Sequence, residues 1–170
     1  VVGHSEDIPL KTDGLNAGIS KTLRFSVPLI AHEVCHYTAL RDFYSLKEKF
    51  LKSGAPAPWW VDEEIKLVEE KGYKDIFGEA FKASKRFQFA CWKTAYEEMR
   101  KSSLLGGFHF LQFADTDAYE NSNGIVDCFD DETCVTPDEF LKFNGDRVII
   151  ADLGSRNRYC SEEITVPVYL

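Results

Sequence analysis

Two short apolar runs stand out in a chain whose other hydrophobic residues mostly recur at helical spacing. Residues 25–31 end directly before His32 and Glu33, and residues 108–113 end before Asp115. Continuous apolar runs of this length that end in polar residues are typical of buried parallel strands. The pattern therefore predicts two strands, each with an acidic side chain just beyond its apolar run. The turn-rich residues before the first run predict a loop that leads into it.

Four further segments have the capping residues or the apolar spacing of helices. Two follow an Asp N-cap and end at a glycine, one has apolar residues at helical spacing with interruptions at Gly78 and Ser84, and one opens with a capping box. These predicted helices are Asp42 to about residue 52, residues 63–71 after Asp62, residues 74–101, and residues 136–143. Residues 147–152 and 164–170 are predicted to be strands.

The composition indicates a folded protein and excludes some partners. Hydrophobic residues make up 44% and charged residues 28% of the 170 residues, which is unlike a disordered chain. A net charge of -8 argues against a nucleic-acid partner. No apolar run approaches the roughly 20 residues of a membrane span, so we expect no membrane association. We also expect no cofactor.

His32, Glu33 and His36 form the pattern H-E-x-x-H, which permits two different chemistries. In zinc proteases this pattern lies on a helix, where the two histidines bind the metal and the Glu is the general base. Pro28 disfavours a helix here because proline interrupts the hydrogen bonds of a helix interior. No third ligand follows the motif either. We therefore favour a strand-end carboxylate without metal, and keep a zinc protease as a minor alternative.

The two apolar runs and their flanks carry a resemblance to a known family. The segments PLIAHEVCHY and GGFHFLQFAD resemble the last two barrel strands of the family 2 glycoside hydrolases, the β-galactosidase and β-glucuronidase group. They are more similar still to bacterial relatives whose nucleophile segment runs H-E-x-G-Q-Y. The matches occur in order over about residues 25–145: His32-Glu33, Tyr37, Asp42-Phe43, Ala83-Ser84, Lys93 with Glu97 and Glu98, Gly106-Gly107-Phe108, Asp115, and Val126-Asp127.

This resemblance implies an α/β fold, the C-terminal portion of a (β/α)8 TIM barrel followed by the start of a β-sandwich. The partial barrel would span residues 1–145, and residues 146–170 would be a linker and the first strands of the sandwich. A complete barrel takes about 250 residues. We therefore expect the remainder of the barrel, from the same or another chain, as a partner, with the general acid/base residue upstream of Val1.

The resemblance also implies an activity, namely that of a retaining β-glycosidase that hydrolyses a carbohydrate with Glu33 as its nucleophile. Several neighbours of Glu33 have hydrogen-bond donors, and an aspartate and aromatic residues elsewhere are suited to hold a sugar. For Asp115, Phe110 and Trp59, capping of a loop or packing in the core are the alternative roles. The expected substrate-binding residues are His32, His36, Tyr37, Asp115, Phe110 and Trp59.

Departures from the family pattern keep a second function open. Cys35-His36 stand where the relatives have Gly-Gln, and residues 115–123 replace a glycine-rich loop. The alternative is a non-catalytic carbohydrate-binding or structural module of an extracellular assembly.

Five cysteines are present, and we expect an extracellular or secretory location. Cys128 and Cys134 bracket an acidic turn. If the protein is secreted they form a short-loop disulfide, and otherwise they are two free thiols.

Overall fold

The computed structural model describes residues 28–154 and 157–170. The predicted loop before the first strand, and residues 25–27 of that strand, lie outside the described residues. The elements in chain order are β1 (Leu29–Val34), α2 (Phe43–Ser53), α3 (Trp59–Glu70), α4 (Lys74–Lys101), β2 (Leu105–Phe110), α5 (Pro137–Asn144), β3 (Ile150–Ala151) and β4 (Val168–Tyr169).

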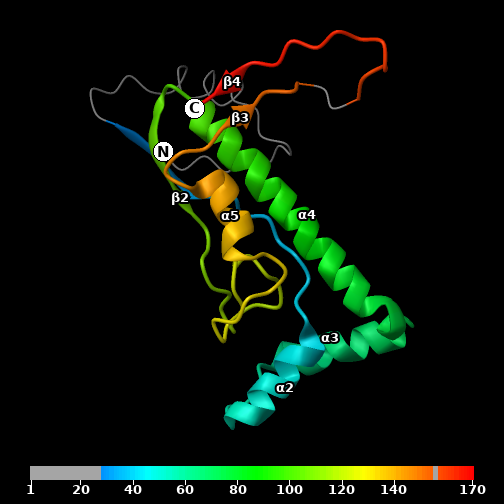
Figure 1. Ribbon diagram of the computed structural model, residues 1–170. Coiled ribbons are helices and arrows are strands. Elements are labelled where there is room, and N and C mark those ends of the chain that lie inside the picture. The colour runs from blue at the N-terminus through cyan, green and yellow to red at the C-terminus, as the bar shows by residue number, and fades with distance from the viewer. Residues whose placement is uncertain (1–27, 155–156) are drawn as a thin grey trace.

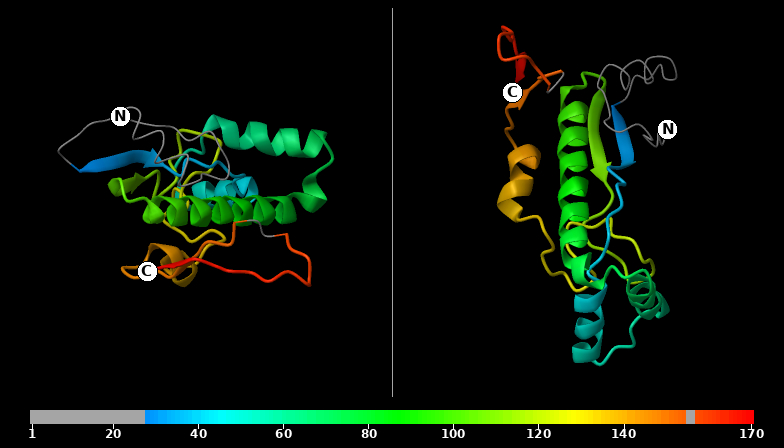
Figure 2. Two further views of the ribbon diagram at one scale, coloured as in Figure 1. Left: turned by 90° about the horizontal axis from the view of Figure 1, so that it is seen from above. Right: turned by 90° about the vertical axis from the view of Figure 1, so that its right-hand side faces the viewer.

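The long helix α4 is the axis around which the other elements are arranged. Figure 1 shows α2 and α3 at the N-terminal end of α4, and β1, β2 and α5 along its C-terminal half. Figure 2 shows that the strands and α5 lie on different sides of α4. A helix of 28 residues is about 42 Å long at 1.5 Å per residue, so α4 connects two groups of elements that lie far apart.

The prediction of a (β/α)8 barrel portion is wrong. β1 and β2 do pair in parallel, but they form a sheet of two strands, and no other described strand extends it. The remaining described pair, β3 with β4, is antiparallel and two residues long in each strand. The two apolar runs do form strands, whereas the expected number of strands rests on the resemblance. The helices α2 and α3 bury their apolar residues against each other and the start of α4, not against a sheet.

Two helices form where their capping residues predict them. Asp42 caps α2, since its Oδ1 accepts a hydrogen bond from the Ser45 amide at 3.1 Å, and Gly54 ends the helix with a φ of 75°. The capping box before α5 is complete. The Thr136 hydroxyl accepts from the Glu139 amide at 3.3 Å, and the Thr136 amide donates to Glu139 Oε2 at 3.1 Å.

The other two helices differ from their predicted form. α3 begins at Trp59 after Pro58, so Asp62 lies in its first turn and does not cap it. Proline before the first turn is well suited to start a helix because its φ is already fixed. α4 continues through Gly78 and Ser84 without a break. Tertiary packing of its buried face outweighs the small intrinsic cost of these two residues.

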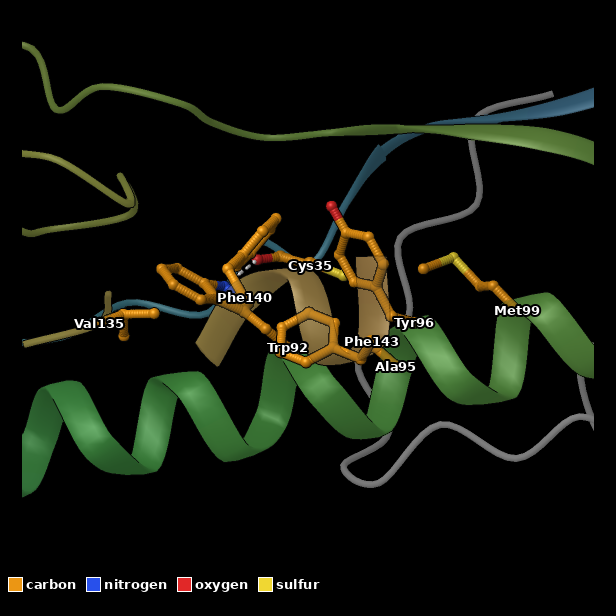
Figure 3. Packing of buried hydrophobic residues seen from close by; sticks show 8 residues of the cluster. All are labelled: Cys35, Trp92, Ala95, Tyr96, Met99, Val135, Phe140 and Phe143. Atoms are coloured by element: carbon orange, nitrogen blue, oxygen red, sulfur yellow. Dashed lines mark hydrogen bonds between the residues drawn. The ribbon is translucent and has the colours of Figure 1, made fainter. Parts of the chain in front are cut away.

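The larger core lies between α4, β2 and α5, and its aromatic side chains meet mainly edge to face (Figure 3). The Tyr96 ring lies 4.8 Å from that of Phe108 and 5.2 Å from that of Phe143, centroid to centroid. The buried Trp92 donates its indole N–H to the carbonyl of Cys35 at 3.1 Å. This bond fixes the chain just beyond β1 to the C-terminal half of α4.

A smaller core lies at the other end of α4. It contains buried residues of α2, α3 and the first turns of α4: Phe43, Leu46, Trp60, Val61, Val68 and Phe77. The two cores therefore pack against different stretches of the same helix, α4.

Gly124, in the loop after β2, is packed closely by the backbone around it, whereas Gly78 in α4 is not. A Cβ on Gly124 would lie 2.6 Å from the carbonyl oxygen of Val126 and 2.8 Å from the carbonyl carbon of Ala114, whereas nothing lies within 4 Å of a Cβ on Gly78. We expect Gly124→Ala to lower the free energy of unfolding by about 3 kcal/mol, the upper end for overpacked sites. Gly78→Ala should raise it by about 1 kcal/mol because alanine is the better helix former.

Urea unfolding of both variants beside the wild-type protein measures these changes. Equal stabilities of the two variants would contradict the close backbone packing at Gly124.

Candidate functional site

Glu33, the predicted nucleophile, lies where β1 departs from regular strand geometry. The residues Glu33 and Cys35 have φ angles of 55° and 67°, and the pairing register with β2 is irregular between Ala31 and Val34. A left-handed backbone costs roughly 1–2 kcal/mol for a residue other than glycine, and such positions are concentrated at functional sites. The Glu33 side chain is 41% exposed, so its carboxylate is accessible to a ligand.

Two histidines on adjacent strands accompany Glu33. The Nε2 atom of His32 lies 3.7 Å from Glu33 Oε1, and its Nδ1 atom lies 3.0 Å from Nδ1 of His109 on β2. The imidazole rings are stacked with centroids 5.0 Å apart. One ring donates and the other accepts in this hydrogen bond, so at least one of them is neutral when the bond is present. The pair therefore fixes His32 beside the carboxylate.

His109 belongs to no motif that the sequence offers. Its signal is the alternation of β2, in which Phe108 and Phe110 pack against the core while His109 is exposed. The parallel pairing of β1 and β2 brings the outward-facing His32 and His109 together.

The helix required for a zinc-protease motif does not form. His32 and Glu33 lie in β1, and His36 lies beyond its end. The two histidines are therefore not on one helix face, and His36 Nε2 is 2.8 Å from Nδ2 of Asn123. Within residues 28–154 and 157–170, no group of three or more His, Cys, Asp or Glu side chains is placed to hold a metal ion.

The other predicted substrate-binding residues have other roles in the described part of the chain. Tyr37 and Phe110 pack against the larger core, and burial raises the pKa of the Tyr37 hydroxyl to about 12. Trp59 is 73% exposed, but it begins α3 at the opposite end of α4 from β1 (Figure 1). Among the predicted substrate-binding residues, His32 makes the one polar contact with Glu33 that the described part of the chain contains.

Asp115 is buried and holds the loop that follows β2. Its Oδ1 accepts from the amides of Asn123 at 2.8 Å and Gly124 at 2.6 Å, and its Oδ2 accepts from the Ser122 hydroxyl at 2.7 Å. The guanidinium Nε of Arg41 lies 3.8 Å from Oδ2. This is the loop-capping role that the sequence left open beside sugar binding.

Lys85 of α4 completes this buried network. Its fully buried ammonium donates to the Ser122 hydroxyl at 2.9 Å and to the Gly124 carbonyl at 3.0 Å, and lies 5.6 Å from the centroid of the Trp92 ring. Burial lowers the pKa of Lys85 to about 8, although the nearby Asp115 carboxylate acts in the opposite direction. The sequence analysis missed Lys85, yet the residue lies four positions after Phe81 on the buried face of the helix.

All five cysteines are free, which is the second of the two alternatives for Cys128 and Cys134. Burial raises the pKa of both of these thiols, and it raises that of Cys35 to about 12. These thiols are therefore protonated near neutral pH, and none of the three has the low pKa of a reactive nucleophile.

Comparisons with known proteins add no family. No protein-family model matches this chain, and no curated protein is significantly similar to it. None of the helices in the described part is long and apolar enough to cross a membrane. The family resemblance and the extracellular location therefore stay predictions from the sequence.

The lowered pKa of Lys85 predicts a specific pH dependence of stability. Between pH 8 and the ordinary value of 10.5, the unfolded chain binds a proton at Lys85 that the folded protein has released. The free energy of unfolding contributed by this residue therefore rises with pH in that window. The stability of the wild-type protein relative to Lys85→Met should increase by about 2 kcal/mol from pH 7.5 to 9.5.

Denaturant unfolding of both proteins at the two pH values measures this difference, in which titrations shared by both proteins cancel. Lys82→Met, an exposed change on the same helix, is the control and should show no such increase. A relative stability that is constant or falls with pH would show that Lys85 is charged throughout.

Proposed function

We propose that this protein cleaves glycosidic bonds by double displacement, with Glu33 as the nucleophile. The observation that carries the proposal is the placement of Glu33, an exposed carboxylate on a left-handed backbone at the end of β1. A strained position of this kind persists where the surrounding structure fixes it, and here the paired strands and the Trp92–Cys35 hydrogen bond do so.

In this mechanism the Glu33 carboxylate attacks the anomeric carbon, and the bond to the leaving oxygen breaks as the glycosyl ester forms. Water then hydrolyses the ester and restores the carboxylate. His32 orients the carboxylate, because its Nε2 atom lies 3.7 Å from Glu33 Oε1. His109 is a positioning residue because it acts through His32.

A retaining glycosidase also needs a second carboxyl group about 5–5.5 Å from the nucleophile, to protonate the leaving group. Within the described residues, the one ion-pair partner of Glu33 is His32. We propose, from the family resemblance alone, that the general acid/base comes from outside the described residues.

The same observation favours a second candidate function, carbohydrate binding without turnover. A site with a single carboxylate and two histidines can hold sugar hydroxyls by hydrogen bonds without breaking the glycosidic bond. The experiment on the proposed function therefore has to separate binding from formation of the glycosyl ester.

Activated fluorosugars make the first chemical step testable in this chain alone. Dinitrophenolate is a leaving group that needs no protonation, so the missing acid/base does not prevent formation of the ester. Incubation with 2,4-dinitrophenyl 2-deoxy-2-fluoro-β-glycosides of glucose, galactose and glucuronic acid should release one equivalent of phenolate. Mass spectrometry of peptides should then find the sugar on Glu33.

Two variants complete this experiment. Glu33→Gln should abolish labelling, a loss of at least about 1000-fold in rate for removal of a nucleophile. Glu63→Gln, an exposed change in α3, should label as the wild-type protein does. Labelling that persists in Glu33→Gln would sink the proposal. Saturable binding of the unmodified glycosides with no labelled peptide would favour the binding module.

A further inference from the structure

A polar cavity of about 150 Å³ lies between the start of α2 and the loop that follows β2. Its lining includes Arg41, Asp42 and Ser45, Glu132, and Phe81 of α4, which contributes an aromatic ring. His32, Glu33 and His36 do not line it. The cavity is thus distinct from the site around Glu33.

Arg41 has an unused hydrogen-bond donor in this region. The side chain is 3% exposed, and two of its nitrogens are engaged, Nε with the carbonyl of Asn121 at 2.9 Å and Nη2 with that of Thr116 at 2.5 Å. Its Nη1 has no hydrogen-bond partner within the part of the chain that the structure describes. An unsatisfied buried donor costs about 1–3 kcal/mol, and more when it is charged. A ligand that offers Nη1 an acceptor removes this cost.

The charges of the lining residues disfavour an anion as that ligand. Arg41 faces Asp115, and Lys49 is paired with Asp127, so these four charges compensate one another. Two further lining carboxylates, those of Asp42 and Glu132, give the lining residues a net charge of -2, and the buried ammonium of Lys85 lies behind the lining, where it donates to the Ser122 hydroxyl. A phosphate or carboxylate ligand would be repelled by them.

The groups that remain for hydrogen bonding need a ligand that both accepts and donates. Arg41 Nη1 requires an acceptor, whereas the Glu132 carboxylate and the second oxygen of Asp42 are able to accept from a ligand's donors. The Ser45 hydroxyl does either. A hydroxyl group both accepts and donates, so several hydroxyl groups on one ring satisfy this set without adding charge.

We propose that this cavity binds one ring of a neutral sugar. Its volume is about ten times the roughly 10–15 Å³ that one water needs, and below the roughly 300–1,000 Å³ of pockets for drug-sized ligands. Phe81 supplies the apolar surface on which the C–H face of a sugar ring packs. The inference goes beyond the proposed function because it needs neither Glu33 nor hydrolysis.

The experiment is a titration followed by nuclear magnetic resonance of the ¹⁵N-labelled chain. The probes are the methyl β-glycosides of glucose, galactose, mannose and xylose, with glycine and inorganic phosphate as the zwitterionic and anionic alternatives. We expect the Arg41 side-chain Nε–H signal and the Ser45 amide signal to shift saturably with at least one neutral glycoside, with a millimolar Kd. Glycine and phosphate should not shift them.

Three variants locate the binding. Glu132→Gln, an exposed change, removes one accepting carboxylate and should weaken binding about ten-fold. Ser45→Met fills the cavity from α2 and should abolish it. Glu163→Gln is the matched exposed control and should leave the Kd unchanged.

Glu33→Gln separates this inference from the proposed function. If the proposed function is wrong, the glycoside still binds at Arg41 in this variant as in the wild type. Loss of binding in Glu33→Gln but not in Glu132→Gln would place the sugar at β1 and overturn the inference. It would equally be overturned if no glycoside bound, or if glycine or phosphate were the one probe that did.

Discussion

A buried ionic network holds this structure together at its middle. Asp115 accepts hydrogen bonds from two backbone amides and the Ser122 hydroxyl, and Ser122 in turn accepts from Lys85. Arg41 approaches the same carboxylate from the residue before the N-cap of α2. Three segments far apart in sequence therefore meet at one carboxylate. The Asp115 carboxylate is tolerated in the interior because these donors surround it, and removal of one buried group of the network leaves its partners uncompensated.

The network also explains how one long helix supports two separate cores. Lys85 lies near the middle of α4, with the smaller aromatic cluster toward the N-terminal end and the larger one, around Trp92 and Tyr96, toward the C-terminal end. The loop between β2 and α5 is fixed to the helix at this point through Ser122 and Gly124. Both candidate sites depend on this attachment. The loop bounds the polar cavity that Arg41 lines, and His36, near Glu33, contacts Asn123 of the same loop.

Glu33 illustrates a different constraint, that of backbone strain. Its left-handed conformation occurs within β1, which is paired with β2, and two residues before Cys35, whose carbonyl accepts from Trp92. The flanking contacts hold the residue in a conformation that it would not adopt alone. The carboxylate is thereby placed at a fixed point beside the His32–His109 pair. Proposed catalysis and proposed sugar binding thus arise in two places, one set by a strained strand end and the other by a buried guanidinium.

The sequence by itself determined the local elements. The apolar runs predicted β1 and β2, and the caps at Asp42 and Thr136 predicted α2 and α5, because strand burial and capping are properties of neighbouring residues. It also identified Glu33 as a residue at the end of a strand. It did not determine how many strands would pair, since pairing is a long-range contact that no local pattern records, and the barrel prediction was wrong for this reason.

The tertiary structure alone decided which polar residues meet. His109, Arg41 and Lys85 carry no motif, and their roles arise from the partners that the parallel strands and α4 bring to them. The same packing placed Phe110 in the core and Trp59 at the far end of the molecule. A residue's type and spacing fix what it is able to bind, but which groups lie within hydrogen-bond distance depends on contacts between segments far apart in the chain.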